Sequence, residues 1–101
     1  MAIRSLLLCD SPPVTLNVTG PETVSVRWLA ERFGEMLGTE PVLVGEEGPT
    51  ALLNNASVSH RLLGYPQVTL RQMMEWTAGW VDSGGETLGK PTHFQEREGA
   101  F

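Results

Sequence analysis

Residues 14–44 constrain the fold of this chain more than any other stretch, because they combine two strand-like patterns with one helical pattern. Residues 14–18 (VTLNV) alternate apolar and polar side chains, as a strand with one buried face does. Residues 26–37 carry an apolar stripe at helical spacing, and residues 42–44 (VLV) form a short strand-like run. A strand, a crossover helix and a strand of these lengths predict a βαβ unit with parallel strands. The expected fold class is therefore α/β.

Residues that favour helix ends flank the helix predicted over 26–37. Ser25 is a good N-cap, and Gly38 follows the last apolar residue, where a left-handed C-terminal turn suits glycine. Gly34 lies inside the helix, where glycine costs about 1 kcal/mol relative to alanine. Either another backbone approaches closely at Gly34, or the chain tolerates the cost.

Two shorter helical segments lie outside this unit. Residues 2–8 read as the end of a helix that packs its apolar side chains. A second helix is predicted over 57–63, with Asn55 or Ser57 as its cap and Gly64 at its end.

The last predicted helix spans 70–82. Thr69 and Gln72 form a capping box at its start. We therefore expect residues 1–83 to form one small α/β subdomain. Residues 84–101 show no periodicity and are expected to form an irregular tail, either disordered or docked on a partner or a missing domain.

The composition argues against two classes of function. The net charge is -5 and the seven Lys and Arg residues are scattered singly, so we expect no nucleic-acid partner. No run approaches the ~20 apolar residues of a membrane-spanning helix, so we expect no membrane partner. Cys9 is the only cysteine, which excludes an internal disulfide and favours a reducing compartment, the cytoplasm.

No residues assemble a catalytic or metal centre by their spacing. His60, His93 and Cys9 lie far apart and outside any metal-ligand spacing, and His60 reads as a surface histidine. Glu46 and Glu47 are adjacent in a loop, which is typical of a solvated turn rather than an acid–base pair. We assign no catalytic residue and no metal ligand.

Three tryptophans lie on the predicted helices. Trp76 and Trp80 are four residues apart on one helix, and Trp28 lies off the centre of its own apolar stripe. One interpretation is packing at the edge of the core. The other is an exposed aromatic interaction surface that something outside this chain covers.

The order of these motifs resembles the C-terminal portion of extended short-chain dehydrogenases/reductases, the NAD(P)-dependent sugar epimerase/dehydratase family. That family has an Asn-Val-Gly-like turn after a strand, a helix from Ser-Val to Leu-Gly, and Asp-x-Ser-Lys and Leu-Gly-Trp-x-Pro segments before a closing helix. The similar segments here are 16–20 (LNVTG), 25–26 (SV), 37–38 (LG), 55–58 (NASV) and 63–66 (LGYP). The resemblance covers residues 2–82.

The resemblance implies the substrate-side part of such an enzyme. The family's other half binds the dinucleotide with a Gly-rich loop and carries a Tyr-x-x-x-Lys pair. This sequence has neither, since Thr69 stands four residues after Tyr65 and Lys90 is the only lysine. The chain is therefore expected not to be catalytic alone and to hold no cofactor. NAD or NADP is implied for the parent enzyme, and the missing dinucleotide-binding domain and a small-molecule substrate are the implied partners.

Asn17, Glu22 and Asn55 are the best candidates for substrate-facing residues, although capping and turn roles explain each of them equally well. The family's Arg-Pro-Gly-Asp-like stretch, which meets the phosphates of nucleotide sugars, is replaced here by 45–50 (GEEGPT). Two carboxylates in that place argue against a nucleotide sugar and leave a neutral or smaller carbonyl or hydroxyl substrate as plausible.

Two other functions are carried as alternatives. One is a free-standing, non-enzymatic binding or dimerisation module that uses the surface of Trp28, Trp76 and Trp80. The other is a small enzyme complete in 101 residues, which the lack of an assembled nucleophile and base argues against.

Overall fold

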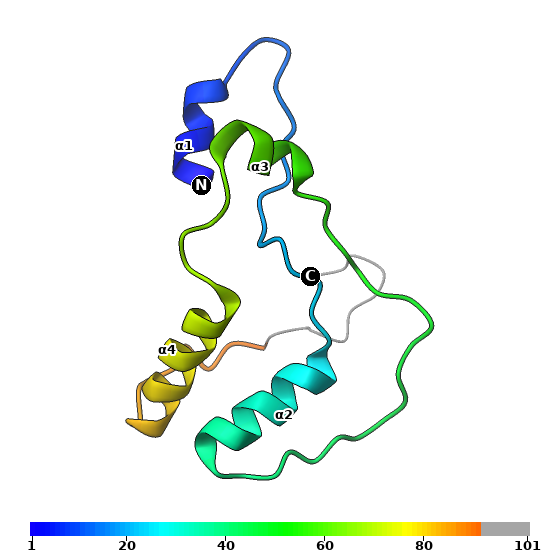
Figure 1. Ribbon diagram of the computed structural model, residues 1–101, viewed down its shortest axis with the longest axis vertical. Helices are drawn as coiled ribbons and strands as arrows, with labels where there is room; N and C mark the ends of the chain where they lie inside the picture. The colour runs from blue at the N-terminus through cyan, green and yellow to red at the C-terminus, as the bar shows by residue number, and fades with distance from the viewer. Residues whose placement is uncertain (92–101) are drawn as a thin grey trace.

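The computed structural model describes residues 1–91, and these residues form short helices joined by long extended segments (Figure 1). The elements are α1 (Ala2–Ser5), the 3₁₀ turn η1 (Leu6–Leu8), α2 (Val26–Leu37), α3 (Ser57–Leu63) and α4 (Leu70–Asp82). No residue among 1–91 belongs to a strand. The prediction of an α/β fold with a βαβ unit is therefore wrong.

The two segments predicted as strands, 14–18 and 42–44, stay unpaired. Within residues 1–91 no backbone hydrogen bond joins them. Val42 and Val44 are 86% and 88% exposed, so the run that suggested a buried strand lies in the open. An alternation of apolar and polar residues indicates only that one face of an extended segment is apolar and favours burial. A strand also needs a neighbour for its ladder hydrogen bonds, and neither segment finds one.

The bounds of α2 confirm the predicted helix over 26–37. The Ser25 hydroxyl accepts a hydrogen bond from the Trp28 amide at 3.4 Å, which caps the first turn. At the other end Gly38 adopts the left-handed conformation, with φ of 65°. Both ends of the helix are thus fixed by local residues.

The bounds predicted for α3 and α4 are also confirmed. The Asn55 side chain accepts from the Ser57 amide at 3.0 Å just before α3, and Gly64 follows its last residue. At the start of α4, the Thr69 hydroxyl accepts from the Gln72 backbone amide at 3.2 Å, which is one of the two hydrogen bonds of the predicted capping box.

Gly34 has the packing reason that its position in a helix suggested. A Cβ built there would lie 2.6 Å from the Thr39 carbonyl oxygen and 2.8 Å from Pro41 Cδ. The chain therefore folds back against α2 immediately after Gly38, and only glycine leaves room for that backbone.

The helices lie in two pairs, with α1 beside α3 and α2 beside α4 (Figure 1). Arg4 ties the first pair together by donating to the Leu63 carbonyl at 3.2 Å. Ile3 and Leu7 nonetheless stay exposed, so the prediction that residues 2–8 pack their apolar side chains is wrong. A helix of this length presents too little surface to cover them.

The core is small. The buried apolar side chains are Ala56, Leu63, Met74 and Ala78. The chain exposes 8943 Å², compared with about 5,600 Å² for a folded monomer of its mass. Its radius of gyration is 16.7 Å, compared with about 13 Å for a compact chain of this length. No helix within residues 1–91 is long and apolar enough to cross a membrane.

Candidate functional site

A polar cleft lies between the segment that leads into α2 and the segment that leads into α3. It consists of two adjoining compartments of about 450 and 440 Å³. The lining residues common to both compartments are Gly20, Pro21, Thr23, Leu53 and Asn54. A volume of this size suits a small-molecule ligand.

Two of the predicted substrate-facing residues meet beside this polar cleft. The Asn17 amide donates to the Asn55 backbone carbonyl at 3.3 Å, which joins segments 38 residues apart. The Asn55 side-chain oxygen is already engaged by the Ser57 amide, as described above. The Asn17 side chain therefore links the two segments, whereas the Asn55 side chain folds onto its own segment. Contact of either side chain with a substrate stays a prediction.

Glu22, the third predicted residue, lines one compartment of the polar cleft. The Glu22 carboxylate lies close to the backbone of Gly20. Its Oε2 atom is 3.2 Å from the position that a Cβ atom on Gly20 would occupy. Among residues 1–91 no Lys or Arg lines either compartment, so Glu22 gives this part of the cleft a negative character. Its contact with a substrate stays a prediction, as it does for Asn17 and Asn55.

His60 was missed as a site residue, because its surroundings in the sequence suggested an ordinary surface histidine. Its Nε2 lies 3.1 Å from the Thr19 carbonyl oxygen, which can only accept, so Nε2 donates. Its ring stacks on Tyr65 with centroids 4.7 Å apart. Both rings line the polar cleft. The sequence did contain one signal, the helical spacing of His60, which is four residues after Ala56 and three before Leu63. Both of these apolar residues are buried in the structure.

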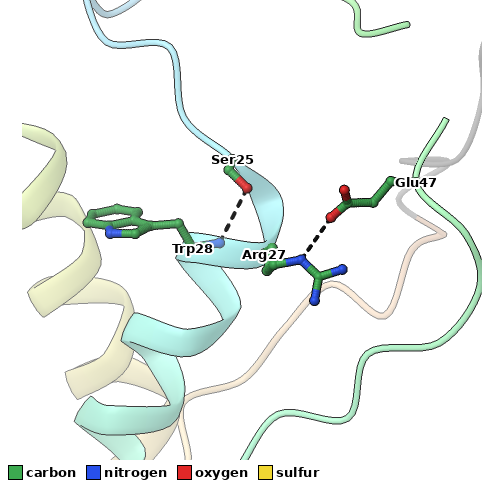
Figure 2. Close-up of polar contacts among 4 residues, drawn as sticks. All are labelled: Ser25, Arg27, Trp28 and Glu47. Carbon is green, nitrogen blue, oxygen red and sulfur yellow. Dashed lines mark hydrogen bonds and ion pairs between the residues drawn. The ribbon is translucent and has the colours of Figure 1, made fainter. Parts of the chain in front are cut away.

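The three tryptophans have different surroundings. Figure 2 shows Trp28 extending from α2 toward α4. The Arg32 guanidinium lies over the Trp28 ring, with its Cζ atom 5.7 Å from the ring centroid. The Trp80 indole donates to the Glu86 carbonyl at 3.1 Å, and Gly85 lies directly against the ring. Trp76 is 59% exposed. The proposed interaction surface of these three residues stays a prediction.

The apolar residues of α4 span more of the helix than α2 covers. At 100° per residue they occupy an arc of about 200°, twice the width of an ordinary core-facing stripe. Met74 and Ala78 in one half of the arc are buried, whereas Met73, Trp76 and Trp80 in the other half are about half exposed. This half, called the outer face of α4 below, is apolar surface that residues 1–91 cover only in part.

Charged side chains pair with one another away from the polar cleft. Arg27 leaves α2 on the side opposite Trp28 and donates to Glu47 at 2.8 Å (Figure 2). The predicted solvated turn thus contains an exposed ion pair. On α4, a hydrogen bond from Arg71 to Glu75 and the charge of that carboxylate raise the pKa of Arg71. No group of three His, Cys, Asp or Glu in residues 1–91 is placed to hold a metal ion.

Comparisons of this chain with protein-family models, with curated proteins and with solved structures find no match. The resemblance to extended short-chain dehydrogenases/reductases therefore rests on the motifs in the sequence alone.

Proposed function

We propose that this chain is the substrate-side subdomain of an NAD(P)-dependent epimerase/dehydratase-like enzyme. It contributes the polar cleft to the active site and covers that site, and it is not catalytic by itself. The observation that carries the proposal is the apolar surface that the chain leaves open. A self-contained domain buries such side chains in its own core.

The amount of open surface supports a large partner. The chain exposes about 3,300 Å² more than a folded monomer of its mass. Permanent interfaces bury roughly 1,000–2,500 Å² on each partner. The exposed apolar side chains occur in separate segments, which include Ile3 and Leu7, Val42 and Val44, Leu52 and Leu53, and the outer face of α4. A partner domain that contacts the chain along its length covers these segments better than one self-complementary patch does.

The motif order supports the identity of that partner. The family that the sequence resembles supplies the dinucleotide and the Tyr-x-x-x-Lys pair from its other half. In this proposal the partner domain holds NAD or NADP, because the part of the polar cleft that residues 1–91 form offers the pyrophosphate a carboxylate and no Lys or Arg. The exposed free thiol of Cys9 is consistent with placing the enzyme in the cytoplasm.

An immunoblot of the source cells with an antibody against this chain tests the proposal. We expect a product longer than this 11.0 kDa chain by a domain of roughly 150–200 residues. Once purified, that product should bind NADH or NADPH, measured by nicotinamide fluorescence. A product of 11.0 kDa that binds neither dinucleotide would contradict the proposal.

The outer face of α4 favours a second candidate, a dimerisation module without enzymatic activity. Met73, Trp76 and Trp80 are spaced i, i+3 and i+7, so they form one seam on which a second copy can pack. Sedimentation of the chain separates the two functions. Dimerisation that Trp76→Ala abolishes, and that the control Arg71→Ala on the polar side leaves intact, supports the module. A monomer at all concentrations argues against it.

A further inference from the structure

The chemistry of the polar cleft restricts the ligand that it can hold. Its polar side chains are mostly hydroxyl and amide groups, from Thr19, Thr23, Asn54, Asn55, Ser57 and Tyr65, with the imidazole of His60 beside them. Of the lining residues within 1–91, Glu22 is the only carboxylate and none is Lys or Arg. Such groups exchange hydrogen bonds with uncharged hydroxyl and carbonyl groups but supply no positive charge for a phosphate.

The arginines with assigned contacts are engaged elsewhere. Arg4 donates to the Leu63 carbonyl, and Arg27, Arg32 and Arg71 pair with Glu47, Glu35 and Glu75. Arg61 and Lys90 do not line either compartment. Moving one of the paired arginines into the cleft would break its present contact. A phosphate in the cleft would therefore face the Glu22 carboxylate without a compensating cation from residues 1–91.

Tyr65 adds an apolar surface to this polar lining. One face of its ring is stacked on His60, while the residue as a whole is 69% exposed. His60 is itself held by the Thr19 carbonyl, so the stacked pair has a fixed place at one end of the cleft. The open face of Tyr65 can take the carbon skeleton of a small ligand while amides and hydroxyls bind its polar groups.

We propose that the polar cleft binds an uncharged polyhydroxylated compound and rejects its phosphorylated counterpart. The inference rests on the proposed function only in treating the cleft as a substrate site. Asn54 and Tyr65 bind the ligand, and Glu22 accepts hydrogen bonds from its hydroxyls and repels phosphate. Asn17 positions the walls, because its side-chain amide already donates to the Asn55 backbone carbonyl across the two segments.

Titration of the ¹⁵N-labelled chain with glucose and with glucose 1-phosphate, followed by amide chemical shifts, tests this inference. Glucose should move the amides of Gly20, Asn54 and Tyr65, and the phosphate ester should bind at least about tenfold more weakly. Asn54→Ala should weaken glucose binding, whereas Gln67→Ala, outside the cleft, should leave it unchanged. Glu22→Gln should reduce the difference in affinity between glucose and glucose 1-phosphate.

Equal or tighter binding of glucose 1-phosphate at these amides would overturn the inference. So would the absence of any shift with glucose up to roughly 100 mM, where even a very weak site becomes occupied. Neither result depends on the size of the native product or on its binding of NADH. Failure of the ligand inference and failure of the proposed function are therefore distinguishable.

Discussion

Alanine at Gly34 and alanine at Gly79 should change stability in opposite directions. Both glycines lie inside helices, and alanine in a helix interior is favoured over glycine by about 1 kcal/mol. The surroundings differ. A Cβ at Gly34 would lie 2.6 Å from the Thr39 carbonyl oxygen, whereas a Cβ at Gly79 meets no atom within 4 Å.

The magnitudes follow from these distances. Gly79→Ala should raise the free energy of unfolding by about 1 kcal/mol, because it gains helix propensity and creates no clash. Gly34→Ala has the same gain, but it pushes against backbone, and overpacking of this kind costs about 1–3 kcal/mol. The net change at Gly34 is therefore a loss of up to about 2 kcal/mol.

Urea unfolding followed by far-ultraviolet circular dichroism measures both variants. Subtracting the change in the free energy of unfolding of Gly79→Ala from that of Gly34→Ala cancels the gain in helix propensity. The remaining free energy is the cost of the clash between the new Cβ and the backbone at Thr39. If Gly34→Ala stabilises the chain as much as Gly79→Ala does, the segment 39–41 does not pack against α2, and the reasoning fails.

Three other substitutions test single contacts. Ser25→Ala should lower the free energy of unfolding by about 1 kcal/mol in the same urea assay, because it removes the N-cap of α2; no change would deny the cap. Gly85→Ala should displace the Trp80 indole and shift tryptophan emission to longer wavelength; unchanged emission would mean that the contact does not form in solution. Arg27→Ala should change the free energy of unfolding by less than about 1 kcal/mol, because its ion pair with Glu47 is exposed; a larger loss would indicate a buried pair.

The open apolar surface links the fold to the proposed function. The apolar arc of α4 is wider than the surface that α2 covers, so part of it faces water. Contact between apolar side chains and water is unfavourable and marks a surface that another molecule or domain covers. The same holds for the exposed valines of 42–44. These features are expected of a subdomain that completes its packing on another domain, and under the proposed function they predict that the chain is more stable with that domain than alone.

The helices were predictable because their signals are local. Ser25 and Gly38 act on residues within one or two turns, and the apolar spacing of each helix is read within the helix itself. The prediction of two strands failed for the opposite reason. Residues 14–18 and 42–44 have strand-like side chains, but a ladder depends on a neighbouring strand that the pattern of one segment does not reveal.

The polar cleft shows the same division. The sequence singled out Asn17 and Asn55 as residue types that bind polar groups, but only the tertiary structure brings them together across 38 positions. His60 became a cleft residue because Thr19 lies 41 positions away in sequence and 3.1 Å away in space. By itself the sequence determined the bounds of α2, α3 and α4, the absence of a dinucleotide loop and the net negative charge. Tertiary structure decided which apolar faces are covered and which polar groups meet, because both depend on contacts between distant segments.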